Sequence, residues 1–118
     1  MNKTTKCLFL LLIVQILSCA KMYAPIDNNR KWAIEDTRNA CEKRHECAAV
    51  GLNGALYLLG GRGIKPVEKY DPLSKAWSKL VETPIEMHHF QAITFDDEIY
   101  VMGAFTGGYP HETPIPNI

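Results

Sequence analysis

The chain has 118 residues, with 13 basic and 13 acidic side chains and a formal net charge of zero. A chain of this length ordinarily forms one domain. Because it carries no excess of positive charge, it offers no basic surface to nucleic acid or to anionic lipid, and we expect no nucleic-acid partner.

The first residues have the pattern of an export signal. Lys3 and Lys6 precede an apolar run from Cys7 to Leu17. This run is too short to span a bilayer, and its length is that of a signal-peptide core. We therefore expect a signal peptide over residues 1–18 and a protein that leaves the cytoplasm.

The end of this segment resembles the processing site of bacterial lipoproteins. Ile16-Leu17-Ser18-Cys19 places an aliphatic residue, and then a small one, before the cysteine that is acylated in such proteins. The resemblance implies a lipid anchor at Cys19 that attaches the exported protein to the bacterial cell envelope. The alternative is ordinary cleavage after Ala20, which would release a periplasmic or secreted protein.

Residues 19–43 are interpreted as a tether that ends in an outer strand. The first part is polar and contains proline, which disfavours regular structure. We expect this strand at Lys31 to Ile34. Trp32 stands before the first copy of the repeat that is described next, just as Trp77 stands before the second copy. The competing interpretation is a short helix from Asp36 to about His45.

The rest of the chain repeats itself at an offset of 43 residues. This offset separates three pairs of matching residues: His45 and His88, Tyr57 and Tyr100, and Gly60 and Gly103. A fixed period of this size, with glycine and aromatic residues in phase, is typical of β-propeller blades. We place the first copy at residues 44–85 and a truncated second copy at residues 86–118.

Each copy begins with a predicted β-hairpin. In the first copy, strands at Cys47 to Leu52 and Ala55 to Gly60 flank Asn53-Gly54, the dipeptide that best suits a type I′ turn. In the second copy Asp96-Asp97 stands at the turn, and aspartate also tolerates the left-handed backbone that the turn requires.

Two runs within these hairpins, Leu56 to Leu59 and Ile99 to Met102, are apolar at every position. A strand with one wet face would alternate, so we expect both faces to be covered by neighbouring blades. Stacked repeats need about three units to bury their apolar faces. We therefore expect this chain to be completed by further blades or by self-association.

Two further strands complete the first copy. They are predicted at Val67 to Tyr70, ended by an Asp-Pro turn, and from Ala76 to Leu80. Trp77 lies in the last of these strands, and we expect it to form the core together with Tyr57 and Leu58.

These marks together resemble the kelch repeat. They are Gly60-Gly61, then the string Val-Glu-Lys-Tyr-Asp-Pro at residues 67–72, then Trp77, and the resemblance covers residues 44–103. The second copy departs from the pattern, because Gly103-Ala104 replaces its double glycine and weakens the second repeat.

The resemblance implies an all-β fold made of antiparallel kelch-type propeller blades, about one and a half of them in an incomplete propeller, preceded by a signal-peptide helix. The strings Gly-Arg-Gly-Ile-Lys-Pro-Val-Glu and His-His-Phe-Gln-Ala also look like those of exported bacterial kelch proteins.

The C-terminal stretch from Phe105 is expected to be a loop, because it contains three prolines and two glycines. Tyr109, His111 and Glu112 lie on it. Together with Arg62, which we expect to pair with an acidic neighbour, they are the candidate ligand-facing residues.

His45, His88 and His89 are candidate channel-facing residues. Several imidazoles and a carboxylate such as Glu46 could converge at one end of a propeller channel and hold a metal. No recognised metal-ligand spacing is present, however, so we expect the histidines to cap strands and we assign no metal and no cofactor. Cys41 and Cys47 are either a disulfide or two free thiols.

The residues favour a non-catalytic binding module over an enzyme. Neither a Gly-x-Ser-x-Gly nucleophile turn nor a phosphate-binding loop followed by a helix is present. We expect recognition of a protein or a glycan through the loops between strands. The alternatives are a fragment of a kelch-fold carbohydrate-active enzyme, galactose-oxidase-like or sialic-acid-mutarotase-like, and a truncated gene product with no activity of its own.

Overall fold

The computed structural model describes residue 29 and residues 31–116, so the signal peptide and the anchor residue Cys19 lie outside the described residues. The chain divides into two units, residues 1–34 and residues 35–118, and every described strand lies in the second unit. Among the described residues, none forms a helix long and apolar enough to cross a membrane.

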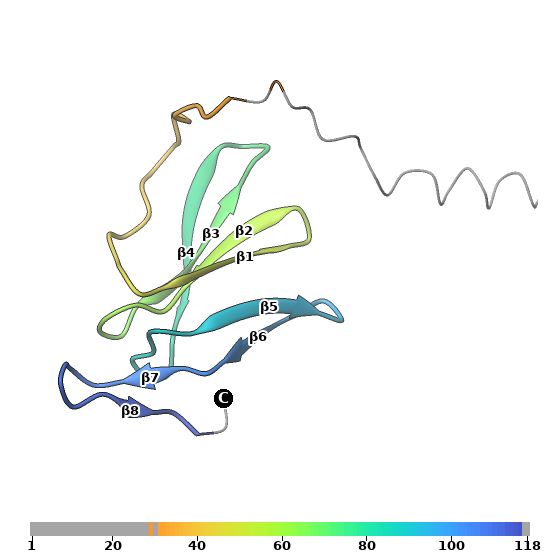
Figure 1. Cartoon of the computed structure of the whole chain (residues 1–118). Helices are drawn as coiled ribbons and strands as arrows, with labels where there is room; N and C mark the ends of the chain where they lie inside the picture. The colour runs from red at the N-terminus through yellow and green to blue at the C-terminus, as the bar shows by residue number, and fades with distance from the viewer. Residues whose placement is uncertain (1–28, 30, 117–118) are drawn as a thin grey trace, which may run out of the picture. The chain divides into compact units, whose positions relative to one another are not determined.

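The described part of the chain is all-β, as expected, and its strands are antiparallel (Figure 1). The strands are β1 (Ala48–Leu52), β2 (Ala55–Leu59), β3 (Pro66–Asp71), β4 (Ala76–Glu82), β5 (Gln91–Phe95), β6 (Glu98–Met102), β7 (Phe105–Thr106) and β8 (Thr113–Pro114). The first four form one sheet in the order β1-β2-β3-β4, and the other four form the hairpins β5–β6 and β7–β8.

Both predicted hairpin turns are present. Leu52 pairs with Ala55 across Asn53-Gly54, where φ is 49° and 75°. In the second hairpin φ is 50° at Asp96 and 60° at Asp97. Two consecutive positive φ values are the geometry of a type I′ turn, whose twist matches that of the flanking strands.

A buried ion pair lies on the four-stranded sheet. The guanidinium of Arg44 contacts Glu68 of β3 at 2.5 Å, and both side chains are 1% exposed. Arg44 also donates to the carbonyl oxygens of Gly60 and Pro66, while the backbone N–H of Glu42 donates to the carboxylate of Glu68. A buried charge is tolerated only when it is paired and hydrogen-bonded, and both conditions are met here.

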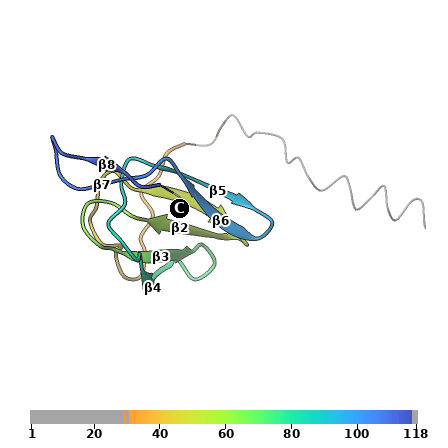
Figure 2. The same ribbon diagram turned by 90° about the horizontal axis from the view of Figure 1, so that it is seen from below.

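One face of the sheet packs against the β5–β6 hairpin, as Figure 2 shows from below. The buried residues at this junction are Leu59, Met87, Phe90 and Ala104. The core agrees only in part with the expected one. Tyr57 is half-buried and packs against this core, whereas Leu58 and Trp77 are half-buried outside it, and the ring of Trp77 contacts Tyr70 at a tilt with centroids 5.2 Å apart.

Glycine is required at the end of β2, but not at the matching position of the second copy. A Cβ on Gly60 would lie 2.5 Å from the carbonyl oxygen of Met87 and 2.5 Å from the ring of Phe90. Gly103 has open space around it, although its φ is also positive. The next residue, Ala104, is 2% exposed and belongs to the core.

Within the described residues, only one face of the β5–β6 hairpin is covered, as expected of a chain without neighbouring blades. The strands of the β5–β6 hairpin alternate: Ala92, Ile99 and Val101 face the core, while the opposite face is exposed. The large apolar side chains on that exposed face are Ile93, Phe95, Tyr100 and Met102.

The C-terminal loop expectation is wrong in part, since β7 and β8 form a hairpin of two-residue strands. β7 reaches this position because His88 and Phe105 exchange both backbone hydrogen bonds at 2.9 Å. A strand this short tolerates Pro114, whose missing N–H removes one donor at most.

The predicted outer strand at residues 31–34 is not present, and the segment before β1 pairs with the sheet at Arg38 instead. Residues 31–37 are neither strand nor helix, so the helix alternative from Asp36 is wrong as well. The N–H of Arg38 donates to the carbonyl of Lys75 at 2.7 Å, and the N–H of Trp77 donates to the carbonyl of Arg38 at 3.0 Å. This parallel bridge covers part of the open edge of β4.

Gly60→Ala should destabilise the chain more than Gly103→Ala, its counterpart 43 residues later. Each change puts a side chain at positive φ, which costs about 1–2 kcal/mol. Gly60→Ala adds overpacking against Met87 and Phe90, which typically costs a further 1–3 kcal/mol or so. Urea denaturation followed by tryptophan fluorescence measures both. Equal losses for the two variants would contradict the close packing at Gly60.

Candidate functional site

Four titratable side chains gather where the starts of β1 and β5 meet the β7–β8 hairpin. We call them the His–Glu cluster: Glu46 before β1, His88 and His89 before β5, and Glu112 from the loop between β7 and β8. One nitrogen or oxygen atom from each of Glu46, His88 and His89 lies within 4.8 Å of the other two.

The repeat places two members of the cluster side by side. Glu46 and His89 occupy the same position in the two copies, and both have a left-handed backbone, with φ of 58° and 53°. The N–H of His89 donates to the carbonyl of Glu46 at 3.2 Å. Since both residues lead into the first strand of their copy, their side chains meet at one end of the two hairpins.

His88 is fully buried, and its hydrogen bonds define its tautomer. Its Nε2 lies 2.9 Å from the carbonyl oxygen of Gly107, which can only accept, so Nε2 carries the proton. In neutral His88 the lone pair is then on Nδ1, which lies 2.9 Å from Nδ1 of His89. His89 donates in that contact, because one of the two nitrogens must carry a proton.

Arg62 holds the two carboxylates. Its guanidinium donates to Glu46, to Glu112 and, at 2.7 Å, to the carbonyl of Gly107. The hydrogen bond from Arg62 lowers the pKa of Glu46, although desolvation opposes it, and the bonds to Glu46 and Glu112 raise the pKa of Arg62. The expected pairing of Arg62 with an acidic neighbour is thus confirmed, and there are two such neighbours.

Each carboxylate keeps one oxygen that Arg62 does not bind. Oε1 of Glu46 lies 3.6 Å from Nε2 of His89, and Oε2 of Glu112 lies 3.8 Å from Nδ1 of His89. The cluster therefore presents imidazole nitrogens and carboxylate oxygens to one small region. Such a set can exchange protons or bind a cation, and it contains no hydroxyl or thiol nucleophile.

Glu86 joins the two loops that border the cluster. Its carboxylate accepts from the N–H of Gly63 at 2.7 Å and from the N–H of Gly107 at 3.3 Å. The hydrogen bond from Gly63 is the main reason why the pKa of Glu86 is lowered. The loop after β2 and the loop after β7 are therefore connected twice, by Glu86 and by Arg62.

The predicted site residues divide into two groups. Tyr109 and His111 are exposed at the tip of the β7–β8 hairpin, where a ligand could reach them. Arg62 and Glu112 are paired with each other and half-buried. Of the histidines, His88 is fully buried.

His45 and His89 keep solvent contact. The side chain of His45 is 72% exposed and its Nδ1 lies 3.6 Å from Glu46, whereas the side chain of His89 is 46% exposed. The sequence contained one indication of the cluster, since Glu46 and His89 occupy the same position in the two copies of the repeat. Residues at the same position meet at the same end of adjacent hairpins. Cys41 and Cys47 are both free thiols.

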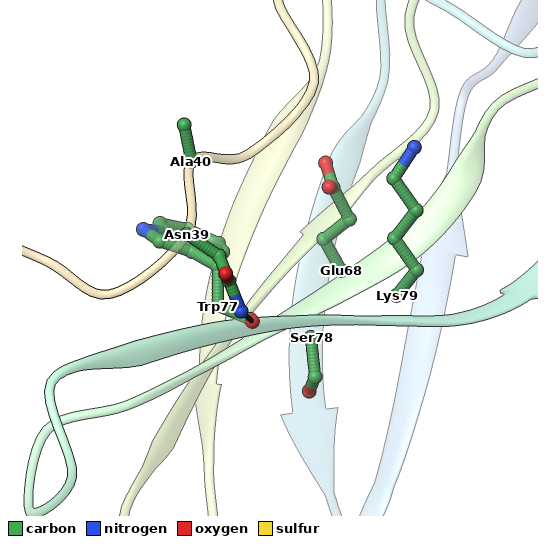
Figure 3. Close-up of a pocket in the computed structure, with 6 residues that line it drawn as sticks. All are labelled: Asn39, Ala40, Glu68, Trp77, Ser78 and Lys79. Carbon is green, nitrogen blue, oxygen red and sulfur yellow. Dashed lines mark hydrogen bonds between the residues drawn. The ribbon is translucent and has the colours of Figure 1, made fainter.

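A separate cavity of about 270 Å³ lies between β4 and the segment before Arg44 (Figure 3). Its polar groups are already bound: Asn39 donates to the carbonyl of Trp77 at 3.2 Å, and Glu68 pairs with Arg44. The remaining lining residues are Ala40, Ser78 and Lys79. The ammonium group of Lys79 is itself 3.4 Å from the carboxylate of Glu42, so the cavity offers a ligand few free polar groups and the His–Glu cluster is the stronger candidate site.

No protein-family model matches the chain. The features of the chain that bear on its function are the 43-residue repeat, the His–Glu cluster and the exposed surfaces of the second unit.

Arg62→Met should loosen the β7–β8 hairpin. The change removes a donor from Gly107 and leaves Glu46 and Glu112 without their shared partner. We expect amide hydrogen exchange in residues 105–114 to become several-fold faster, with little change in β3 and β4. Arg38→Met is the matched control, because the guanidinium of Arg38 binds, among the described residues, only the exposed carbonyl of Ser74. Unchanged exchange in residues 105–114 would show that Arg62 does not hold the hairpin.

Proposed function

We propose that the chain is a non-catalytic binding module, an exported kelch-type propeller segment that recognises a protein or a glycan. The observation that carries this proposal is Tyr109, whose side chain is 88% exposed at the tip of a hairpin that is fastened on both sides. An exposed aromatic ring on a rigid support suits stacking on a sugar ring or on an apolar side chain of a peptide.

The fastening of this loop favours recognition because it lowers the entropy lost on binding. The N–H of His111 donates to the carbonyl of Gly108 at 2.7 Å, which closes the turn around Tyr109. Arg62 binds Gly107 on one side of the turn and Glu112 on the other. A loop that is ordered before the ligand arrives binds more tightly than a loose one with the same contacts.

The exposed face of the β5–β6 hairpin supports completion by further blades or by a second copy. Ile93 and Tyr100 are paired across the hairpin, and their side chains are 44% and 42% exposed. Phe95 and Met102, on the same face, are 69% and 48% exposed. A contiguous apolar face of this kind is typical of an interaction surface. In a propeller, the next blade would cover it.

Export and anchoring complete the proposal. A lipoprotein-type signal at residues 1–18 would deliver the binding module across the membrane, and acylation of Cys19 would hold it at the bacterial cell envelope. The module would then meet protein or glycan ligands at the envelope surface. Incorporation of labelled palmitate into the wild type, and its loss in Cys19→Ala, distinguishes the anchored protein from a secreted one.

Tyr109→Ala should weaken ligand binding by about tenfold or more, the loss expected when an aromatic anchor of an interface is removed. The probes are a printed saccharide array and a phage-displayed peptide library, which separate the glycan and protein forms of the proposal. Leu73→Ala is the control, because Leu73 is 96% exposed on the β3–β4 turn, away from Tyr109. Equal binding by the two variants, or no binding to either probe, would reject the role of this loop.

Phe95→Lys should reduce association between copies of residues 20–118, because it places a charge in the exposed apolar face of β5–β6. We expect the wild type to sediment as a dimer or a larger species at micromolar concentration, and the variant to sediment closer to the monomer. Lys69→Ala, on β3, is a control outside this face. A wild-type chain that sediments as a single monomer with slow amide exchange in both hairpins would contradict the need for completion.

A further inference from the structure

We propose that the His–Glu cluster binds a divalent cation of the zinc class, with His88, His89 and Glu46 as ligands and Glu112 as the fourth. This inference does not depend on the proposed recognition loop. It holds whether or not Tyr109 contacts a protein or a glycan.

The distances within the cluster fit a tetrahedral site after small side-chain movements. Zinc lies about 2.0–2.1 Å from its nitrogen and oxygen ligands, so neighbouring ligand atoms are roughly 3.3 Å apart. Nδ1 of His88 lies 2.9 Å from Nδ1 of His89 and 3.9 Å from Oε2 of Glu46. Oε2 of Glu112 lies 3.8 Å from Nδ1 of His89. Each of these separations differs from the required value by less than about 1 Å.

His88 has the second contact that metal-binding histidines usually make. A ligating imidazole almost always donates its other N–H to a carbonyl or a carboxylate, which sets both its tautomer and its orientation. Nε2 of His88 donates to the carbonyl of Gly107 at 2.9 Å, and Nδ1 points toward His89 with its lone pair. Full burial of His88 keeps this orientation in place.

Arg62 gives the two carboxylates the same kind of support. It binds Oε2 of Glu46, the oxygen that lies 3.9 Å from Nδ1 of His88, so the cation and Arg62 would share that oxygen. It binds only Oε1 of Glu112, which leaves Oε2 of Glu112 free on the side of His89. With neutral histidines, one guanidinium and two carboxylates leave a net charge of −1 in the cluster. A cation is attracted to that charge, while Arg62 acts as a positioning residue for both ligands.

The competing interpretation is a hydrogen-bonded network that only connects the hairpins. In that network Nδ1 of His88 and Nδ1 of His89, two basic nitrogens, must share one proton at 2.9 Å. A cation would use the Nδ1 lone pairs of both imidazoles once the single proton of neutral His89 has moved from its Nδ1 to its Nε2. It would also link three segments of the chain, before β1, before β5 and after β7, which stabilises the folded state over the unfolded one.

The ligand set selects the class of ion. Imidazole nitrogen suits zinc and its transition-metal neighbours, whereas magnesium and calcium prefer sites made only of oxygen. A set of two imidazoles and two carboxylates therefore favours Zn²⁺, and Co²⁺ should enter the same site.

The test is titration of the full chain, purified in detergent micelles, with ZnCl₂ in a calorimeter. We expect saturable binding of one Zn²⁺ per chain and none of Ca²⁺ or Mg²⁺. His89→Ala should lower the zinc affinity by at least about tenfold, as the loss of a supporting contact already does. His111→Ala is the matched control, because His111 is an exposed imidazole outside the cluster, and its affinity should stay within about twofold of the wild type.

Co²⁺ provides a second readout, since visible absorption of a tetrahedral cobalt centre should appear in the wild type and be lost in His89→Ala. If circular dichroism shows that His89→Ala is unfolded, the nearly isosteric Glu46→Gln takes its place with the same expected loss. No saturable zinc binding by the wild type would overturn the proposal. Equal weakening by His111→Ala and by the cluster variant would overturn it as well.

Discussion

The buried ion pair between Arg44 and Glu68 is the interaction on which the four-stranded sheet depends. Its guanidinium reaches the carbonyls of Gly60 and Pro66, so it connects the end of β2 to the start of β3 across the loop between them. The carboxylate in turn fixes the segment before β1 through the N–H of Glu42. Removing either partner would leave an uncompensated buried charge, which costs more than the loss of an ordinary surface pair.

The position of the loop after β2 decides how the second copy packs. With the end of β2 fixed, the N–H of Gly61 donates to the carbonyl of Met87 at 2.9 Å. Met87 and Phe90 then fill the space above Gly60, where a Cβ would not fit. His88, the residue after Met87, pairs with Phe105 of β7. The short segment of Met87 and His88 is therefore bordered by the backbone of the first copy and by the C-terminal hairpin.

The same junction produces the His–Glu cluster. The backbone pairing of residues 87 and 88 brings the starts of β1 and β5 together, and it places the carbonyl of Gly107 within hydrogen-bond distance of Nε2 of His88. Arg62 lies on the loop that Gly61 fixes, within reach of carboxylates from two other segments. The charged groups therefore meet next to a packed apolar junction, where partial burial strengthens their hydrogen bonds.

Local patterns in the sequence determined the elements of this fold. The hairpins follow from Asn53-Gly54 and Asp96-Asp97, because few residue pairs adopt two positive φ values in succession. Only tertiary structure decided which strand faces are covered, since the apolar runs do not show how many neighbours the chain has.

Tertiary structure also decided the site. Glu46, Arg62, His88 and Glu112 lie far apart in the sequence, and they meet because backbone pairing brings their segments together. The equal phase of Glu46 and His89 indicated one contact of the cluster. The positions of Arg62 and Glu112 depend on how the β7–β8 hairpin folds back, and that is a long-range arrangement which no local pattern of residues specifies.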